Sequence, residues 1–118
     1  MLRWLFWIPA LGWAGVIYHL SSQPAGPTPS WWFPHADKLI HMGLFGIQSL
    51  LLYLAIRRAP AWSPRRAAVA AFLLAVLYGS TDEIHQLFTP SRSSDPLDVA
   101  ADATGAACVF TLGWRRRP

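Results

Sequence analysis

Charged residues are scarce in this sequence. Of its 118 residues, 14% are Asp, Glu, Lys or Arg, whereas 53% are apolar and seven are Trp. A typical soluble domain carries roughly 25% charged residues. The shortage of charge, together with the Trp content, therefore indicates a membrane protein. A chain of this length suffices for one domain, which we expect to occupy residues 1–118.

The sequence has a single cysteine and lacks the common zinc-protease motif. The single Cys108 lies among Ala, Val and Phe, so one chain cannot form a disulfide framework. The string DEIHQ contains one histidine, whereas the HExxH motif needs two on one helix face. These absences exclude a disulfide-stapled secreted domain and a protease of the HExxH type.

Four apolar stretches are long enough to cross a membrane as helices, which takes about 17–25 residues. They cover approximately residues 4–20, 39–56, 67–88 and 97–114. The first stretch is rich in Trp and lacks a small-x-small cleavage site after it, so we expect a span and not a cleaved signal peptide. The sequence therefore predicts an all-α fold: a polytopic membrane protein with a bundle of four transmembrane helices.

Basic residues mark one side of this bundle. Eight of the ten Lys and Arg residues fall in segments that four crossings would place together: Arg3, Arg57, Arg58, Arg65, Arg66, Arg115, Arg116 and Arg117. Positively charged loops stay in the cytoplasm. We therefore expect a protein of the bacterial cytoplasmic membrane, with both termini cytoplasmic.

All the acidic residues fall at the opposite, extracytoplasmic ends of the predicted helices. They are Asp37, Asp82, Glu83, Asp95, Asp98 and Asp102, accompanied by the two remaining bases, Lys38 and Arg92. Acidic residues contribute little to membrane topology. The positive-inside rule therefore explains the basic side of the protein and leaves the acidic side unexplained.

Helical spacing aligns these polar groups in stripes. Asp37 and His41 are four residues apart, as are Asp98 and Asp102, and Glu83 precedes Gln86 by three. Residues at these spacings share one face of a helix. Charges at membrane depth cost a few kcal/mol each, so they normally face a bundle interior or a wet cavity. The sequence therefore predicts a shared polar pocket that opens to the extracytoplasmic side.

Two local patterns have structural interpretations. SDPLD reads as a helix opening, with Asp95 at the N-cap and Pro96 at the first helical position. Gly43, Gly46 and Gly105 have the small side chains that allow helix backbones to approach closely. We therefore expect the glycines to serve packing.

The polar segments resemble a known family. DKLIHMGLFG and STDEIHQLFTPSRSSDPLDVAADATGA are similar to the VanZ-like family of small bacterial membrane proteins, over roughly residues 37–107. The motif positions are Asp37, Lys38, His41, Glu83, Gln86, Arg92, Asp98, Asp102 and Gly105. The family takes its name from a protein linked to teicoplanin resistance, so the resemblance implies a cell-envelope role. It implies neither a reaction nor resistance.

One hypothesis is a site for an envelope lipid or a cell-wall precursor. Lys38 and Arg92 would hold a phosphate or carboxylate, and His41 and Glu83 would exchange protons with the ligand. The candidate catalytic residues are Glu83, His41 and Asp37. The candidate substrate-binding residues are Lys38, Gln86, Arg92, Asp98 and Asp102. The sequence leaves an enzyme and a non-catalytic binding protein both open.

Two alternatives remain beside this hypothesis. A divalent metal ion (Mg²⁺, Mn²⁺ or Zn²⁺) would find oxygen and imidazole ligands at Asp37, His41, Glu83 and Asp102. In the other alternative, Lys38 and Arg92 pair with acids across helices and only lock the bundle together. We expect the protein to contact the lipid bilayer and not to bind nucleic acid. Its small size is compatible with a homodimer.

Overall fold

The computed structural model describes residues 2–24, 26–90, 92 and 94–115, and in these residues every regular element is helical. A 3₁₀ turn, η1 (Arg3–Phe6), leads into α1 (Trp7–Ser22). The long helices α2 (Ala36–Ile56) and α3 (Pro64–Gln86) follow. The fourth element is composite: α4 (Pro96–Ala106), the 3₁₀ segment η2 (Ala107–Val109) and α5 (Phe110–Gly113). The predicted all-α fold is confirmed.

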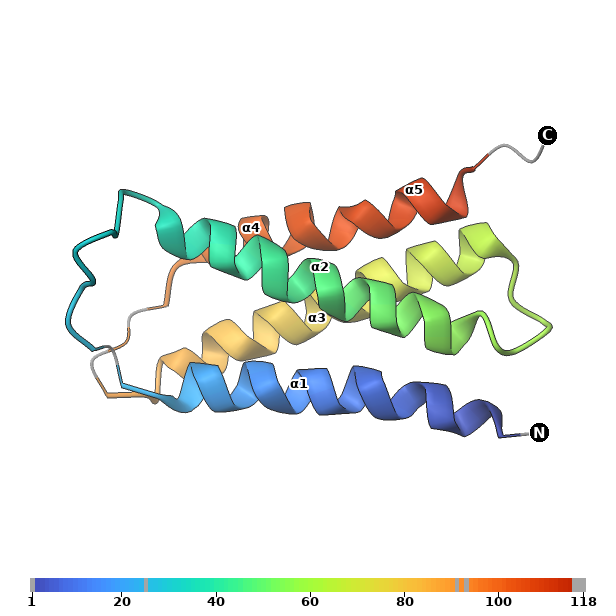
Figure 1. The fold of residues 1–118 in the computed structure, drawn as a ribbon, viewed down its shortest axis with the longest axis horizontal. Helices are drawn as coiled ribbons and strands as arrows, with labels where there is room; N and C mark the ends of the chain where they lie inside the picture. The colour runs from blue at the N-terminus through green and yellow to red at the C-terminus, as the bar shows by residue number, and fades with distance from the viewer. Residues whose placement is uncertain (1, 25, 91, 93, 116–118) are drawn as a thin grey trace.

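The helices form an elongated antiparallel bundle measuring 48 × 29 × 22 Å. α2 packs against α1, α3 and α4 and is the central element. Figure 1 shows both chain ends and the α2–α3 connection at one end of the bundle. The long connection between α1 and α2 and the connection between α3 and α4 lie at the other end, which we call the acidic end because all six acids lie near it in sequence.

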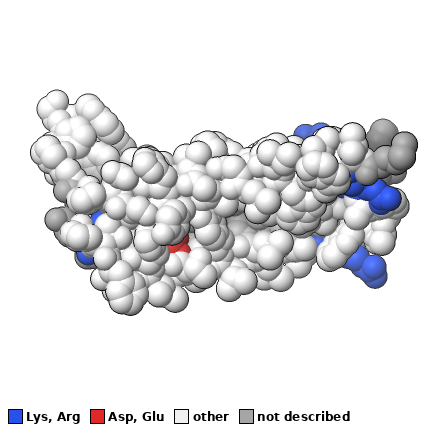
Figure 2. Space-filling model, turned by 90° about the horizontal axis from the view of Figure 1, so that it is seen from below, with Lys and Arg blue, Asp and Glu red and all other residues white. Residues whose placement is uncertain are grey.

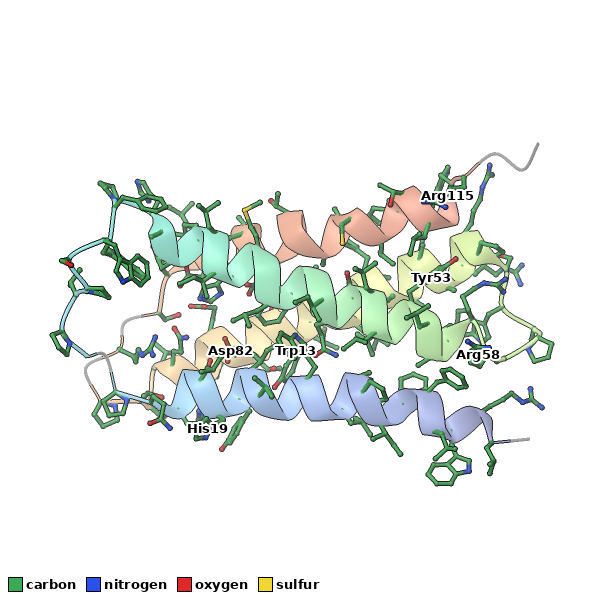
Figure 3. All side chains as sticks on the ribbon, in the orientation of Figure 1. Trp13, His19, Tyr53, Arg58, Asp82 and Arg115 are labelled. Carbon is green, nitrogen blue, oxygen red and sulfur yellow. The ribbon has the colours of Figure 1, made fainter. Side chains whose placement is uncertain are left out.

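The charges divide along this axis. Figure 3 places Arg58 and Arg115 at the end that carries the termini and Asp82 toward the acidic end. Seen from below, the middle of the molecule is almost uncharged, and its Lys and Arg atoms gather mainly at the end with the termini (Figure 2). Arg116 and Arg117 of the predicted basic set lie outside the described residues.

Two helices begin where a side chain caps their first turn. Ser63 Oγ accepts a hydrogen bond from the Arg66 N–H, and Pro64 takes the first helical position. Asp95 Oδ1 accepts one from the Leu97 N–H at 2.9 Å, followed by Pro96. Such caps satisfy an N–H that has no partner inside the helix. The helix opening predicted at Asp95 is thus confirmed, and the cap at Ser63 starts α3 slightly before the predicted residue 67.

Alanines face inward and leucines face outward along α3. Four fully buried alanines form its inner face: Ala67, Ala68, Ala71 and Ala75. On the outer face, Leu73 and Leu77 are 58% and 62% exposed. In water, exposing such side chains would forfeit about 1.5–3 kcal/mol of burial free energy each. α2 and α3 are also long and apolar enough to cross a membrane, so these features indicate a membrane protein.

Three polar side chains attach α1 to its neighbours through backbone carbonyls. Trp13 lies between α1 and α2 (Figure 3), and its Nε1 donates to the Leu44 carbonyl at 2.8 Å. Tyr78 Oη donates to the Ala14 carbonyl at 2.6 Å, and Gln48 Nε2 donates to that of Ala10 at 3.1 Å. Each bond gives a polar N–H or O–H group a partner in an apolar setting, where a hydrogen bond contributes more to stability than it does in water. α1 is therefore a fixed member of the bundle.

The backbones of α2 and α4 approach each other closely at glycine residues. A Cβ atom added to Gly105 would collide with the Met42 carbonyl, and one added to Gly46 would lie 3.3 Å from the Gly105 carbonyl oxygen. Glycine is therefore required at position 105, as the sequence predicted for packing. Gly43 has no atom within 4 Å of such a Cβ, so the prediction that Gly43 also serves close helix packing is wrong. The α2–α4 contact positions the polar side chains described next.

Candidate functional site

The center of the candidate site is a pair of side chains on α2 and α4. His41 Nδ1 lies 2.7 Å from Asp102 Oδ1. An ionised carboxylate only accepts hydrogen bonds, so the ring nitrogen is the donor. This contact places the proton on Nδ1 and leaves Nε2 as the free ring nitrogen, 3.8 Å from Asp98 Oδ2. Asp102 is fully buried, and it therefore orients His41.

Lys38 connects α2 to the start of α4. Its Nζ donates to Asp37 Oδ2 at 2.9 Å, Asp95 Oδ2 at 2.8 Å and Asp98 Oδ1 at 2.6 Å. The ammonium thus has three carboxylate partners, and its hydrogen bond lowers the pKa of Asp95 below the usual value. Of the predicted anion-binding residues, Lys38 is therefore already neutralised by protein groups.

Glu83 connects α3 to the same region. Its Oε2 accepts hydrogen bonds from the Asp95 N–H at 3.0 Å and from Ser94 Oγ at 3.3 Å. The side chain is buried, and its other oxygen, Oε1, has no hydrogen-bond partner among the described residues. Among those residues no hydrogen bond joins Glu83 to His41, although their ligand atoms lie within 4.8 Å of each other.

A cavity of about 310 Å³ opens beside these groups. Its polar lining includes Asp37, His41, Asp82, Gln86 and Arg92, and its apolar lining includes Ile17, Leu20, Ile40 and Leu44. Small-ligand pockets span roughly 300–1,000 Å³. The cavity is therefore large enough for a polar head group and too small for a whole lipid.

Arg92 enters the cavity from the α3–α4 connection. Its Nε donates to the Gln23 carbonyl at 2.9 Å, and one terminal nitrogen donates to the Leu20 carbonyl at 3.4 Å. An arginine has five N–H donors, so these bonds leave others for a ligand. A second hollow, of about 340 Å³, shares Trp32, Asp37 and Arg92 with the first. Arg92 is thus the cation on the boundary between the two.

The predicted site residues separate into two sets. Four of them line the cavity: Asp37, His41, Gln86 and Arg92. The other four, Lys38, Glu83, Asp98 and Asp102, are linked to them or to the start of α4 by the contacts above. The structure therefore brings residues from α2, α3, α4 and the α3–α4 connection to one end of the bundle.

The sequence reasoning missed the contribution of α1. Ser21 Oγ donates to Asp82 Oδ1, and Gln86 Nε2 donates to Ser21 Oγ at 3.4 Å. Both Ser21 and Asp82 line the cavity. A signal was present, because Asp82 and Gln86 share a helix face at a spacing of four residues. Nothing in the sequence distinguished Ser21 from its neighbour Ser22.

Three of the four candidate metal ligands come together. His41, Glu83 and Asp102 each offer one ligand atom, and these atoms lie within 4.8 Å of one another. The fourth candidate, Asp37, is not part of this group, and its carboxylate pairs with Lys38. The group draws one residue from each of α2, α3 and α4.

The fold and the site define a class: a small helical membrane protein with a buried, acid-rich polar site at one end. The sequence profile of the VanZ/LLP1 family matches residues 5–116. The chain therefore belongs to the VanZ/LLP1 family, as its motifs indicated. Among curated proteins and solved structures, none matches the chain significantly.

Proposed function

We propose that the protein binds the anionic head group of an envelope lipid or cell-wall precursor at the extracytoplasmic face of the bacterial cytoplasmic membrane. One observation carries this proposal: the cavity has Arg92 and His41 on its polar wall and aliphatic side chains of α1 and α2 on its apolar wall. An amphipathic ligand whose head is anionic and whose tail lies in the bilayer matches both walls.

The proposal includes a four-span topology with both termini in the cytoplasm. Support comes from the grouping of the chain ends, Arg58 and Arg115 at one end of the bundle (Figures 1 and 3), since basic segments remain in the cytoplasm. At about 1.5 Å per residue, residues 96–113 would extend about 27 Å, close to the hydrocarbon thickness of about 30 Å. The composite fourth helix therefore has nearly the length of a span.

A reporter fused after Pro118 is expected to show a cytoplasmic C-terminus. Two reporters are compared: a fluorescent protein that folds in the cytoplasm, and an enzyme that is active only outside the cytoplasm. A fusion after Pro90, in the α3–α4 connection, is the matched control and should report the opposite side. An extracytoplasmic signal from the Pro118 fusion would overturn the topology and the location of the cavity with it.

Arg92 supplies the charge for head-group recognition. A guanidinium can hold a phosphate or carboxylate through two parallel hydrogen bonds. Lys38 has three carboxylate partners, so Arg92 is the more available of the two predicted cations. Gln86, which also lines the cavity, adds neutral donors and acceptors for the same ligand.

His41 is placed to exchange a proton with a bound head group. Its Nδ1 is held by Asp102 and its ring lines the cavity, which is the arrangement of an oriented general base. Asp37 lines the same cavity. Glu83 would influence the ligand indirectly, because its described hydrogen bonds go to Ser94 and Asp95. We therefore assign proton transfer to His41 in the metal-free protein.

Replacing Arg92 by glutamine is expected to weaken binding of a short-chain prenyl phosphate by about 10- to 100-fold. A hydrogen bond to a charged group contributes about 1.5–3 kcal/mol, and glutamine keeps polarity but not charge. Binding is measured by calorimetry on purified protein in detergent, with the corresponding prenol as ligand control and Arg66→Gln at the opposite end as protein control. Equal affinities for phosphate and prenol would contradict the proposal.

A further inference from the structure

We infer that His41, Glu83 and Asp102 form a binding site for one divalent transition-metal ion, Zn²⁺ or Mn²⁺. The three residues come from α2, α3 and α4, and they are distant in sequence. The inference goes beyond head-group binding, because the ion site is built by residues behind the cavity wall and only His41 also lines the cavity.

The spacing of the ligand atoms suits a single ion. Zinc binds imidazole nitrogen and carboxylate oxygen at about 2.0–2.2 Å, so two ligand atoms on one ion are at most about 4.4 Å apart. The atoms offered by the three residues lie within 4.8 Å of one another. Binding of one ion therefore requires side-chain rotations that draw these atoms closer together.

Unpaired oxygens are the independent observation that points to a ligand. Glu83 is 4% exposed and Asp102 is fully buried, yet Glu83 Oε1 and Asp102 Oδ2 have no hydrogen-bond partner among the described residues. Buried polar atoms without partners are rare in native proteins and call for an explanation such as an ion. A cation bound by these carboxylates would give an unpaired buried oxygen a partner.

The charges leave room for a cation at this position. Lys38 pairs with Asp37, Asp95 and Asp98, and it makes no ion pair with Glu83 or Asp102 among the described residues. Two carboxylates so close together repel each other strongly in a medium of low dielectric constant. A divalent ion neutralises both, whereas a protonated His41 neutralises only one.

The ligand types narrow the class of ion. Imidazole favours Zn²⁺ and other transition metals, whereas Mg²⁺ and Ca²⁺ prefer sites made wholly of oxygen. Metal-binding carboxylates are usually oriented by further hydrogen bonds, and Glu83 Oε2 already accepts them from Ser94 and from the Asp95 backbone. The remaining oxygen of Glu83 is thus the one available to an ion.

The test is metal binding to the full-length protein, purified in detergent, freed of metal with a chelator and titrated with Zn²⁺ or Mn²⁺. We expect about one ion per chain by elemental analysis after dialysis, and at least about 10-fold weaker binding by Glu83→Gln and by Asp102→Asn. Arg66→Gln, a substitution at the opposite end of the bundle, should bind as the wild type does. Wild-type protein without stoichiometric ion, or undiminished binding by both ligand variants, would overturn the inference.

A second measurement does not depend on the folding of the variants. Pulsed electron paramagnetic resonance of Mn²⁺ bound to wild-type protein should show coupling to an imidazole nitrogen, and its absence rules out His41 as a ligand. The Arg92→Gln variant separates head-group binding from metal binding, because it should still bind the metal ion. Protein that binds prenyl phosphate but no metal overturns this inference alone, and protein that binds metal but no prenyl phosphate overturns the proposed function alone.

Discussion

Replacing Gly105 by alanine is expected to disrupt the packing of α2 on α4 and to lower the free energy of unfolding by about 3 kcal/mol, the upper range for overpacking a core. The added Cβ would collide with the Met42 carbonyl oxygen and lie 2.7 Å from the Met42 carbonyl carbon and Cα. Backbone atoms in a helix cannot rotate away as a side chain can. The two helices must therefore separate.

The same separation would dismantle the site. The His41–Asp102 and Lys38–Asp98 contacts both join α2 to α4, and hydrogen bonds weaken steeply when their geometry is lost. The measurement is thermal unfolding of the purified variant in detergent, together with its abundance in the membrane. An unchanged melting temperature would contradict the predicted collision.

Gly43→Ala is the matched control for this substitution. It lies on α2 like Met42, and a Cβ there would meet no atom within 4 Å. Alanine favours a helix over glycine by about 1 kcal/mol, so this variant should be as stable as the wild type or slightly more stable. A large loss of stability at both positions would show that the effect comes from the residue type and not from the α2–α4 contact.

Replacing Lys38 by methionine is expected to destabilise the protein by about 3 kcal/mol, because it leaves the buried carboxylate of Asp98 without its cation. The Asp98 side chain is 8% exposed and lies 2.6 Å from the Lys38 ammonium. Methionine keeps much of the length of lysine and removes only the charge. The measurement is again thermal unfolding in detergent, with helix content followed by circular dichroism.

Two further variants show whether the charge is responsible. Lys38→Met combined with Asp98→Asn should recover much of the lost stability, because the buried negative charge is then removed as well. Asp37→Asn alone should cost less than about 1 kcal/mol, since the Asp37 side chain is 46% exposed. If Lys38→Met is as stable as the wild type, the ion pairs do not lock the bundle, and the structural alternative for this residue fails.

Local features of the sequence predicted much of the fold. Apolar runs of span length predicted four helices, and the described residues contain helices in all four regions. The cap at Asp95 followed from its neighbours alone, because a cap contacts an N–H two residues along the chain. The 3₁₀ segment of residues 107–109 was not predicted, since its sequence contains no proline or glycine to mark a break.

The pairing of charges was not predictable in the same way. The sequence indicated that Lys38 would meet acids, but its partners Asp95 and Asp98 are 57 and 60 residues away. The hydrogen bond between His41 and Asp102, 61 residues away, was not predicted either. Which carboxylate a side chain reaches depends on how far each helix is rotated about its axis. That rotation is set by packing and not by spacing along the chain.

The amino-acid sequence by itself determined the helical class, the family and the separation of basic and acidic residues along the chain. These properties depend on composition, periodicity and local capping, all of which are read along one chain segment. The tertiary structure decided that Arg92 and His41 line a cavity while Lys38 is neutralised, and that Gly105 but not Gly43 lies at a backbone contact. Such contacts exist only where helices cross, and the crossing is settled by interhelical packing that no single segment encodes.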